Sequence, residues 1–587
     1  MGQSFVSNGI VYGITSGQTV EVQPYYNMLS SPYSGAISIP QTVEDNGTTY
    51  TVTALGESAF ESCGNVTGMT LPPTVRSIGP YCFYNTSFTT LQLPDSLRTL
   101  GDHAFLYSSI SSLHLPAHFE EYGSCAFWAR SLSSITVDSD NPYYRSIGGC
   151  LYSKDSLTLC VVPDGTTGVA RVPSYVRHLA DMAFGFCQNI TSVSLPEGLT
   201  SIGSFAFNCC SRVNNVVIPS TVSSIGICPF SYCPQLTSLT IASGYSHYVM
   251  DGLMLYSASY DTLISCHKSE ATVTLHPNVK VIGGFENNSW VRNIEIPSSV
   301  TELSDNCFNG CSLTTIALPA HMKRIGALAF GENKKLTSIT MPQTLLSMGE
   351  GAFSWCEKLT SVVIPDSLKI IPKEAFNSCP RLASVTWGNA VEEIGYAAFW
   401  AMAATDLVLP ETLKKVDDLA FAACTNNLRH VTFRGQTDTI GEAVFRHANL
   451  NYVRFKAVVP PAVTGDGPLS DIGRLDSIVV PCGHIDAYQA DSYWGQFADK
   501  LVEDCNLGIG EVADMQITVY PNPTTGKVRL QGLEEEPVAI ELYDMTGRHV
   551  ATFYRTDSFD IGHLANGSYI VSLISPRNRY LVKLIKW

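Results

Sequence analysis

The segment LTSVVIPDSLKIIPKEAFNSC, residues 359–379, decides the fold, because close copies of it recur along the chain. Residues 336–356 read LTSITMPQTLLSMGEGAFSWC, and residues 236–249 begin another copy, LTSLTIASGYSHYV, which breaks off midway. Within each block of copies, the phenylalanine of the Ala-Phe step or its variants returns every 22 to 24 residues. The fifteen anchor phenylalanines are Phe60, Phe83, Phe105, Phe127, Phe184, Phe207, Phe230, Phe285, Phe308, Phe330, Phe353, Phe376, Phe399, Phe421 and Phe445. A repeat of this length predicts a solenoid in which each copy forms one coil.

The consensus unit, L-x-x-I-x-I-P-x-x-V-x-x-I-G-x-x-A-F-x-x-C, predicts the structure of one coil. L-x-x-I-x-I has the alternation of a short strand, and the proline ends that strand because it cannot donate a ladder hydrogen bond. V-x-x-I-G predicts a second short strand, whose glycine permits the following turn. The Ala-Phe step is then a tight turn that directs an aromatic ring inward. Since one unit cannot bury its own apolar face, we predict a β-rich solenoid of about 23-residue repeats with parallel β ladders and little helix.

Composition excludes several classes of protein. The chain has 587 residues, too many for one ordinary core, and a formal net charge of −16. An acidic chain argues against nucleic acid as a partner, because phosphates require basic patches. No apolar run approaches the roughly 20 residues of a membrane-spanning helix, so no transmembrane span is expected.

The placement of the 18 cysteines indicates packing rather than metal binding. Eight of them follow an anchor phenylalanine by three residues: Cys63, Cys187, Cys210, Cys233, Cys311, Cys356, Cys379 and Cys424. We therefore expect a reduced ladder of small buried side chains, although the strand spacing of about 4.8 Å would also allow occasional cross-links. No C-x-x-C pair of the usual zinc pattern occurs. Cys482 and Cys505 lie outside the repeats and are the first candidates for a disulfide.

Two inserts interrupt the repeats, at about residues 138–177 and 242–282, and they resemble each other (GGCLYSKDSLTLC and DGLMLYSASYDTLISC). Each has the pattern of an alternating strand, a polar turn and a return strand, which predicts a hairpin projecting from the solenoid. Loops on a rigid scaffold often carry function. The insert tyrosines are therefore candidate anchors for a ligand: Tyr143, Tyr144, Tyr245 and Tyr248.

The ends of the chain differ from the repeats. Residues 1–50 alternate around Asn-Gly turns and predict an N-terminal cap for the solenoid of residues 51–455. Residues 456–505 predict a closing cap with a short helical pattern around Tyr488, Trp494 and Phe497. A linker, residues 506–515, then leads to residues 516–587, whose alternating strands predict a small β-sandwich of about seven strands.

The repeat with its Ile-Pro and Ala-Phe marks, together with the paired inserts, resembles the BspA-like class of bacterial surface leucine-rich repeat proteins from about Thr51 to Phe455. This resemblance implies a leucine-rich repeat solenoid and a secreted or surface-displayed binding protein, because several members of the class are adhesins for host proteins or other cells. It supplies no ligand, since the repeats of the class share no binding motif.

The C-terminal segment resembles the C-terminal sorting domain of the type IX secretion system. The matching residues are Pro521, Asn522 and Pro523 with Gly526, then Gly547 and Arg548, then Gly567 with Tyr569, and Lys583 in the basic end. The resemblance implies recognition by the secretion machinery and export to the outer-membrane surface or exterior of a Gram-negative bacterium. Removal of this domain or attachment to the surface would usually follow. The first residues, MGQSFVSNGIVY, lack the layout of a signal peptide, so we expect that such a signal has been removed.

Several tempting sites have simpler interpretations. His114 and His118 have metal-ligand spacing only on a helix, but here a strand-ending proline separates them. Asp138 to Pro142, DSDNP, offers oxygen ligands for calcium, yet Asp and Asn also form turns without a metal. The sequence contains no G-x-S-x-G, H-E-x-x-H or phosphate-loop motif, so we expect no enzyme, no metal and no cofactor.

One strand position points outward in every repeat and forms a long, nearly uncharged face. Its candidate binding residues are Thr70, Gln92, His114, Thr136, Ser194, Thr240, Thr340, Thr386 and Thr432. Threonine simply suits exposed strands, and a broad platform for a ligand is the alternative. Trp128 and Trp400, each directly after an anchor phenylalanine, could lie at the core edge or on the surface.

The function predicted from these features is non-catalytic binding at the cell surface, with adhesion to a host or extracellular-matrix protein as the first hypothesis. Glycan binding is the alternative, and it predicts clustered exposed aromatic residues with amide or carboxylate partners on one face. An enzyme would instead need a cleft with convergent titratable groups.

Overall fold

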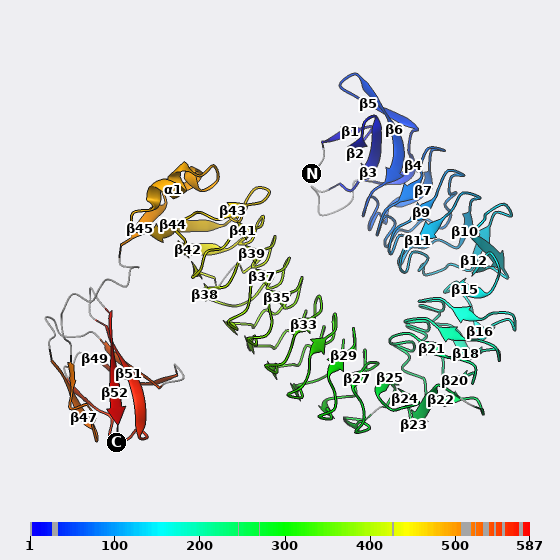
Figure 1. The fold of residues 1–587 in the computed structure, drawn as a ribbon. Coiled ribbons are helices and arrows are strands. Elements are labelled where there is room, and N and C mark those ends of the chain that lie inside the picture. The colour runs from blue at the N-terminus through cyan, green and yellow to red at the C-terminus, as the bar shows by residue number, and fades with distance from the viewer. Residues whose placement is uncertain are drawn as a thin grey trace. The chain divides into compact units, whose positions relative to one another are not determined.

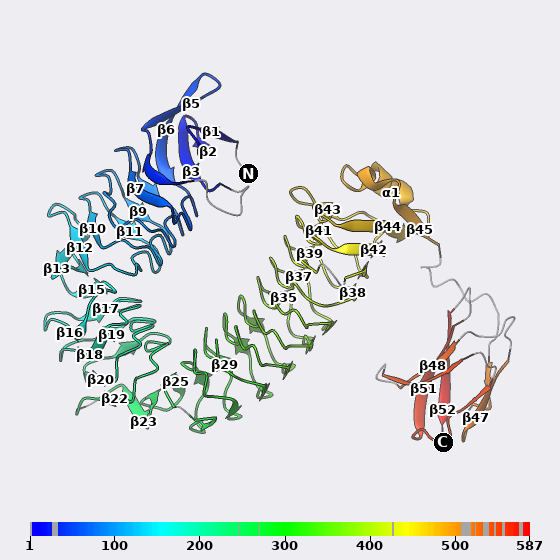
Figure 2. The ribbon, with the colours of Figure 1, turned by 180° about the vertical axis from the view of Figure 1, so that it is seen from behind.

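The computed structural model describes residues 3–25, 33–244, 246–268, 270–424, 428–505, 518–522, 524–531, 539–544, 548–554, 558–574 and 579–586. These residues belong to two compact units, Met1–Glu503 and Asp504–Trp587. The first unit is a β-solenoid of stacked coils, and Figure 1 and Figure 2 show its coils following one another from β3 to β45. Helix is scarce in the described residues, with α1 at Ile485–Ala490 and a 3-10 turn at Trp494–Phe497. The predicted fold class is confirmed.

The first ladder consists mainly of the L-x-x-I-x-I strands, which pair in parallel, and it ends with β45 beside β44. In β32, Ile339 is buried while Ser338 and Thr340 on either side are exposed, as a strand with one face on the core requires. Breaks divide the ladder into mostly two-stranded sheets. Its strands are β4 (Gly35–Ser38), β7 (Val66–Thr70), β10 (Ser112–Leu115), β12 (Ser134–Val137), β16 (Gly168–Arg171), β18 (Ile190–Ser194), β20 (Asn215–Ile218), β22 (Ser238–Ile241), β26 (Thr272–Thr274), β28 (Asn293–Glu295), β30 (Thr315–Ala317), β32 (Ser338–Thr340), β34 (Ser361–Val363), β36 (Ser384–Thr386), β38 (Asp406–Leu409), β40 (His430–Phe433), β42 (Asn449–Phe455), β44 (Arg474–Pro481) and β45 (Leu501–Asp504).

The second ladder consists mainly of two-residue strands, in which the apolar member is buried and the other faces outward. These strands also pair in parallel with the equivalent residues of the next coil. They are β3 (Thr19–Gln23), β6 (Thr48–Leu55), β8 (Ser77–Ile78), β9 (Thr99–Leu100), β11 (Glu121–Tyr122), β15 (Thr158–Val161), β17 (His178–Leu179), β19 (Ser201–Ile202), β21 (Ser224–Ile225), β25 (Thr262–Cys266), β27 (Val281–Ile282), β29 (Glu302–Leu303), β31 (Arg324–Ile325), β33 (Ser347–Met348), β35 (Ile370–Ile371), β37 (Glu393–Ile394), β39 (Lys415–Val416), β41 (Thr439–Ile440) and β43 (Ala462–Val463).

The Ala-Phe turns form the third side of each coil. The N–H of Phe353 donates to the carbonyl of Ala375 in the next coil at 2.8 Å. The rings of Phe353 and Phe376 stack with their centroids 5.3 Å apart and an interplanar angle of 4°. All fifteen anchor phenylalanines are buried, and burying each one contributes roughly 1.5–3 kcal/mol relative to exposure. The predicted inward stack of aromatic rings is therefore confirmed.

The cysteines three residues after the anchors are buried free thiols that also donate hydrogen bonds. Cys379 Sγ lies 3.2 Å from the carbonyl oxygen of Phe353, the anchor of the preceding coil, and Cys233 Sγ lies 3.1 Å from that of Phe207. Burial raises the pKa of Cys379 to about 12, which keeps the thiol protonated and able to donate. The expected reduced ladder is confirmed, and its sulfur atoms donate hydrogen bonds to anchor carbonyls of the preceding coil.

Each insert is a three-stranded antiparallel meander rather than a projecting hairpin. The first meander consists of β13 (Tyr144–Ile147), β14 (Cys150–Ser153) and β15, and the second consists of β23 (Tyr248–Asp251), β24 (Met254–Ser257) and β25. β15 pairs in parallel with β17, and β25 with β27, so each third strand also belongs to the second ladder.

The meanders lie inside the stack because their middle strands are apolar on both faces. Leu151 of β14 packs in the hydrophobic core of the first block, whereas Tyr152 packs in the core of the second. Leu255 and Tyr256 of β24 likewise face the cores of the second and third blocks. A strand that is buried on both faces cannot project into solvent, which is why the hairpin prediction was wrong in this respect.

Both ends of the solenoid are closed. At the start, β1 (Ser4–Ser7) pairs with β2 (Ile10–Ser16), and β5 (Thr42–Asp45) pairs with β6. The Asn8-Gly9 and Asn46-Gly47 turns have positive φ at both residues, the conformation that tight hairpins favour. At the other end, the Trp494 Nε1–H donates to the Pro461 carbonyl at 2.9 Å. Cys482 and Cys505 are disulfide-bonded while the other sixteen cysteines are free, so the expected pair is bonded.

The second unit contains two antiparallel sheets. One sheet has the order β46-β47-β50 and the other β49-β48-β51-β52. Val528 and Phe559 of the first sheet share one hydrophobic core with Leu542 and Val571 of the second, as in a β-sandwich. The strands are β46 (Thr518–Tyr520), β47 (Lys527–Gln531), β48 (Ala539–Asp544), β49 (His549–Tyr554), β50 (Ser558–Asp560), β51 (Gly567–Ile574) and β52 (Arg579–Lys586).

Candidate functional site

A pocket forms where the first enlarged coil lacks its Ala-Phe turn. An ordinary coil uses residues 349–360 between β33 and β34, whereas only residues 162–167 connect β15 to β16. No turn therefore fills the space between the turns that carry Phe127 and Phe184. We call this place the first junction, and the equivalent place after the second meander, at residues 267–271, the second junction. The pocket at the first junction has a volume of about 350 Å³ and is lined by Tyr107, Trp128, Arg130, Asp164, Phe186, Gln188 and Asn189.

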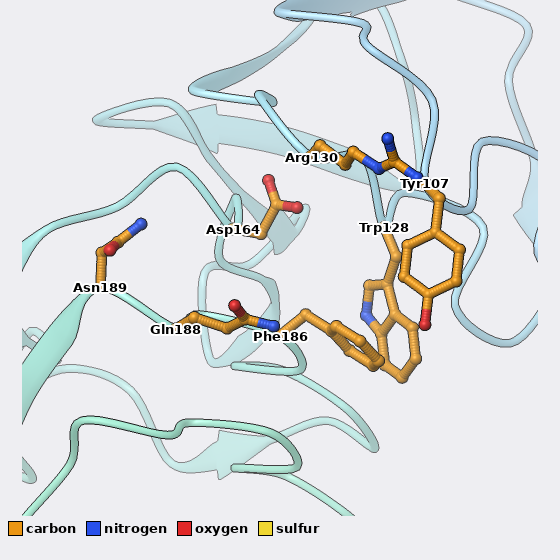
Figure 3. Close-up of a pocket in the computed structure, with 7 residues that line it drawn as sticks. All are labelled: Tyr107, Trp128, Arg130, Asp164, Phe186, Gln188 and Asn189. Carbon is orange, nitrogen blue, oxygen red and sulfur yellow. The ribbon is translucent and has the colours of Figure 1, made fainter. Parts of the chain in front are cut away.

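Three aromatic side chains form one side of this pocket (Figure 3). The ring centroids of Trp128 and Phe186 lie 4.0 Å apart, and those of Tyr107 and Phe186 lie 6.1 Å apart. Tyr107 and Phe186 both follow their anchor by two residues and have φ values of 58° and 61°. The turn conformation thus brings side chains from three coils to one surface, where Tyr107 remains 38% exposed.

Gly185 permits the position of Trp128. A Cβ atom on Gly185 would lie 2.5 Å from Cζ2 of the indole, closer than any real contact. The indole therefore packs directly on the backbone of the turn after the junction. Only glycine leaves that space at this position.

The remaining pocket residues are polar and lie mainly opposite the aromatic group (Figure 3). Arg130 lies over the ring of Tyr107, 5.7 Å from its centroid, and donates to Asn85 Oδ1 at 3.1 Å. Gln188 and Asn189 are exposed. Their amides can donate and accept hydrogen bonds, and the guanidinium can donate.

Asp164 is the acid of the pocket. The neighbouring Gly165 N–H donates to the Leu132 carbonyl at 2.8 Å, which holds the short segment against the preceding coil. Asp164 Oδ1 is buried and has no hydrogen-bond partner among the described residues. Burial raises the pKa of Asp164 to about 7, against the lowering effect of the Gly165 backbone N–H. The group is therefore partly protonated near neutral pH and can donate as well as accept.

The candidate residues of the outward strand face, which we call the first-ladder face, are exposed except for the half-buried Thr432. They are distributed along the ladder rather than gathered. A shallow groove of about 610 Å³ at one break in the ladder brings together Gln92, His114 and Thr136. His114 Nδ1 lies 3.0 Å from Thr136 Oγ1, so the imidazole forms a hydrogen bond along the ladder.

The insert tyrosines take different positions. Tyr143 is 52% exposed. Tyr144 packs against Phe119 and Tyr122, and its hydroxyl donates to the Glu120 carbonyl at 3.2 Å. Tyr248 is half-buried against the core of the second block. Tyr245 lies outside the described residues.

Turn formation accounts for the DSDNP segment. Asp138 Oδ1 accepts from the Asp140 N–H at 2.9 Å. Asn141 is fully buried, donates to the carbonyls of Pro116 and Phe119, and accepts from the N–H groups of Tyr143 and Tyr144. These oxygens thus have partners within the protein.

Trp128 and Trp400 are both half-buried. Trp128 belongs to the pocket wall. His118 is exposed next to the strand-ending proline.

The first part of the sorting motif shapes the sandwich. Asn522 Oδ1 accepts from the N–H of Ile585 in the last strand at 2.9 Å, and Pro521 beside it is exposed. Gly526 is buried, and its carbonyl accepts from the Ile561 N–H at 3.0 Å. Pro523 lies outside the described residues.

The second part of the motif lies at strand ends. The Arg548 N–H donates to Asp544 Oδ1 at 3.0 Å, and the hydroxyl of the buried Tyr569 donates to the Ala565 carbonyl at 2.7 Å. Gly567 is the first residue of β51, and Lys583 belongs to β52. Gly547 and the side chain of Lys583 lie outside the described residues.

The BspA type leucine rich repeat region matches residues 47–158, 167–264, 264–357 and 346–460. The chain belongs to this family. Residues 518–586 match the secretion system C-terminal sorting domain. The protein is therefore a secreted or cell-surface leucine-rich repeat protein whose last unit addresses it to the secretion machinery. No helix of the described residues is long and apolar enough to span a bilayer.

Several solved structures are similar to this chain. A leucine-rich repeat protein from Bacteroides ovatus is 20% identical over 85% of this chain and 99% of that one, with a TM-score of 0.34. A leucine-rich repeat protein from Eubacterium ventriosum is 22% identical over 60% and 95%, with a TM-score of 0.34. A leucine rich cell surface protein from Faecalibacterium prausnitzii is 20% identical over 66% and 95%, with a TM-score of 0.32. No curated protein matches the sequence.

Sequence reasoning identified Trp128 but not its partners in the pocket. The missing signal was the interval from Phe127 to Phe184, in which one anchor phenylalanine is absent. A coil without its turn must leave a space on that side of the stack. Residues that follow the two flanking anchors line this space, together with Tyr107 of the preceding coil and Asp164 of the short connection.

Proposed function

We propose that this protein binds a glycan, without catalysis, at the cell surface, and that the pocket at the first junction holds the sugar. The observation that carries this proposal is the grouping of Tyr107, Trp128 and Phe186 beside Asp164, Gln188 and Asn189. The ring of a sugar has apolar C–H faces and a rim of hydroxyl groups. Aromatic side chains stack on the faces, and amide and carboxyl groups exchange hydrogen bonds with the rim.

The size and charge of the pocket favour a sugar over other small ligands. Its volume of about 350 Å³ is at the lower end of the roughly 300–1,000 Å³ typical of ligand pockets. An aromatic cage for a quaternary ammonium group is disfavoured, because the Arg130 guanidinium, 5.7 Å from the centroid of Tyr107, would repel a cationic ligand. A neutral or acidic sugar fits this arrangement of donors.

Binding without hydrolysis is supported by the number of acids. Glycoside hydrolysis generally needs two carboxyl groups, about 5 to 9.5 Å apart, on either side of the bond. Of the seven residues that line the pocket, Asp164 alone carries a carboxyl group. The buried Oδ1 of Asp164 is better explained as a hydrogen-bond partner for a ligand hydroxyl.

The test is retention of the purified full chain on an array of host and plant oligosaccharides, followed by calorimetric titration of the best-bound one. Trp128→Ala should weaken binding by about 10-fold or more, since one stacked ring is lost. Trp355→Ala is the matched control, because Trp355 is 52% exposed on another Ala-Phe turn. The absence of retention, or equal losses in the two variants, would refute the proposal.

Adhesion to a host or extracellular-matrix protein through the first-ladder face is a second candidate. It is favoured by three exposed valines among the hydroxyl side chains, Val217, Val363 and Val408, which are 45%, 48% and 49% exposed. Such residues can supply apolar contact area in a protein interface. Val363→Lys with Val408→Lys should abolish capture on immobilised matrix proteins and leave glycan retention unchanged; unchanged capture would exclude this face.

A further inference from the structure

Aromatic contacts continue from the pocket over the two preceding coils. The ring of Tyr107 lies 5.8 Å from that of Tyr84, and Tyr84 lies 6.1 Å from Tyr81. Tyr81 in turn stacks on His103 with a centroid distance of 4.8 Å and an interplanar angle of 1°. We call this continuous set the aromatic strip: Tyr81, Tyr84, His103, Tyr107, Trp128 and Phe186.

The strip spans four turns, and its ring contacts run from Tyr84 to Tyr107, from Tyr107 to Phe186 and from Phe186 to Trp128. Its residues belong to the turns around the anchors Phe83, Phe105, Phe127 and Phe184. Before the first junction, the coils follow one another at the strand spacing of roughly 4.8 Å, a step close to the length of one sugar unit in a chain. Tyr81 and Tyr107 are 36% and 38% exposed, so their rings present surface to solvent.

The fold does not require aromatic residues at these positions. Equivalent positions two residues before or after an anchor hold Ser58, Ser62, Ser378 and Ala401, with the same left-handed backbone. The turns can therefore form without aromatic residues, and the strip adds exposed apolar area that the fold does not need. Such area, when contiguous, marks a binding surface.

Polar groups accompany the strip as they do the pocket. Asn85, beside Tyr84, is exposed and accepts from the Arg130 guanidinium. His103 Nδ1 is buried and has no hydrogen-bond partner among the described residues. Burial also lowers the pKa of His103, against the effect of Asp102, so the stacked imidazole is uncharged at neutral pH.

We propose that the pocket is one end of an extended platform and that the ligand is an oligosaccharide chain rather than a single terminal sugar. The chain lies along the aromatic strip, with one sugar ring in the pocket and further rings on Tyr107, Tyr84 and the Tyr81–His103 stack. This proposal rests on the proposed glycan binding and extends it to the class of glycan.

A platform of this kind makes affinity depend on chain length. Each added sugar that reaches another ring should tighten binding by about 2- to 12-fold, the equivalent of one aromatic contact. The gain should stop once the strip is covered. A site for a terminal sugar would bind the short and long forms equally.

The experiment titrates oligomers of one to six units, prepared from the best-bound glycan, into the full chain. Four variants are compared with the wild type: Trp128→Ala, Tyr81→Ala with Tyr84→Ala, Tyr81→Phe with Tyr84→Phe, and the control Trp355→Ala. Thermal unfolding of each variant shows that the solenoid remains folded.

We expect the wild type to bind longer oligomers progressively more tightly. The double alanine variant should bind the hexamer about as weakly as the wild type binds a dimer, while its affinity for the monomer stays unchanged. The double phenylalanine variant should restore the length dependence. If Trp128→Ala abolishes binding but the wild type binds short and long oligomers with the same affinity, the extended platform is refuted and the pocket proposal is retained. If Trp128→Ala binds every oligomer like the wild type, the glycan proposal itself fails.

Discussion

The two junctions interrupt the solenoid in the same way and leave different surfaces. At each one the coil that contains the meander lacks its Ala-Phe turn, and the residues directly after the flanking anchors face each other. At the first junction these residues are Trp128 and Gly185, and the indole lies on the glycine. At the second junction they are Ser231 and Glu286, and the Ser231 hydroxyl donates to Glu286 Oε2 at 2.5 Å. The same gap is an aromatic pocket in one case and an internal hydrogen bond in the other.

The second junction contains two buried ionisable groups, Glu286 and His267. Burial raises the pKa of Glu286 to about 7, although its hydrogen bond from Ser231 acts in the opposite direction. Burial lowers the pKa of His267 to about 4, and its Nε2 lies 2.6 Å from Ser265 Oγ. The side chain after the anchor thus decides whether a junction is open to a ligand or closed by polar contacts.

Substitution inside the meanders should have the largest effect, because both junctions depend on their middle strands. Leu151 and Leu255 are fully buried, so replacing either with alanine should lower the free energy of unfolding by about 2–5 kcal/mol. Urea unfolding followed by tryptophan fluorescence measures this. Leu346→Ala is the control, since Leu346 is 63% exposed. If either variant lowered the free energy of unfolding no more than Leu346→Ala does, the meanders would not separate the cores.

The pH dependence of stability should be the next largest effect, and both junctions should contribute to it. The folded pKa values of Glu286 and Asp164 are both raised to about 7, so the folded chain binds protons that the unfolded chain lacks, and stability rises as the pH falls from 8 to 6.5. The rise should be about 1–2 kcal/mol for the two groups together, and Glu286→Gln should remove about half of it. Below about pH 6.5 the unfolded state protonates His267 before the folded state does, which offsets part of the continuing gain from the carboxyl groups, so the rise in stability should become less steep. Urea midpoints across this range measure both trends; an unchanged profile in Glu286→Gln would contradict the assignment.

Exchanging the junction pairs tests whether they determine the difference in binding. Trp128→Ser with Gly185→Glu gives the first junction the residues of the second and should weaken glycan binding by about 10-fold or more. The reciprocal variant, Ser231→Trp with Glu286→Gly, should keep the wild-type affinity at the first junction and lose about half of the rise in stability between pH 8 and 6.5. Calorimetry and urea unfolding of both double variants provide the readouts. Wild-type binding by the first variant would show that the pair is not decisive.

The smallest effect should come from one methyl group. Gly185→Ala places a Cβ atom against the indole of Trp128, and the shift of the ring should weaken binding by about 3-fold, with less than about 1 kcal/mol lost in stability. Gly64→Ala is the matched control, because its Cβ would have Ser87 Oγ at 3.8 Å as its nearest neighbour. If both variants bind like the wild type, the indole does not need the glycine.

Periodicity made most of the solenoid predictable, because each anchor is buried by copies of the same unit. Spacing alone located the Phe353–Phe376 stack and the buried Cys379. The many serine and threonine residues were harder to interpret. Ser367 and Thr344 donate to the carbonyls of Leu345 and Met322 in the preceding coil, so part of the Ser and Thr content bridges coils rather than forming a surface.

The pocket could not be derived from the unit, because it exists only where the unit is incomplete. Asp164 and Phe186 come from different coils, and their proximity depends on how far the flanking turns approach each other when one turn is missing. The distance between the flanking turns cannot be read from a periodic sequence pattern. The place of β15 in the second ladder was missed for a related reason, since it depends on pairing with β17 in the next coil.

Fourteen of the sixteen free cysteines are buried, all but Cys150 and Cys209, in a protein destined for the oxidising exterior. Oxidants and alkylating reagents act on exposed thiolates, so a stacked coil conceals its sulfur and an opened coil reveals it. Because cysteines occur in many successive coils, the number of labelled sulfurs reports how many coils have come apart. Mass spectrometry after a pulse of iodoacetamide would thus show which cysteines have been alkylated and so which coils have opened, with no probe added to the sequence.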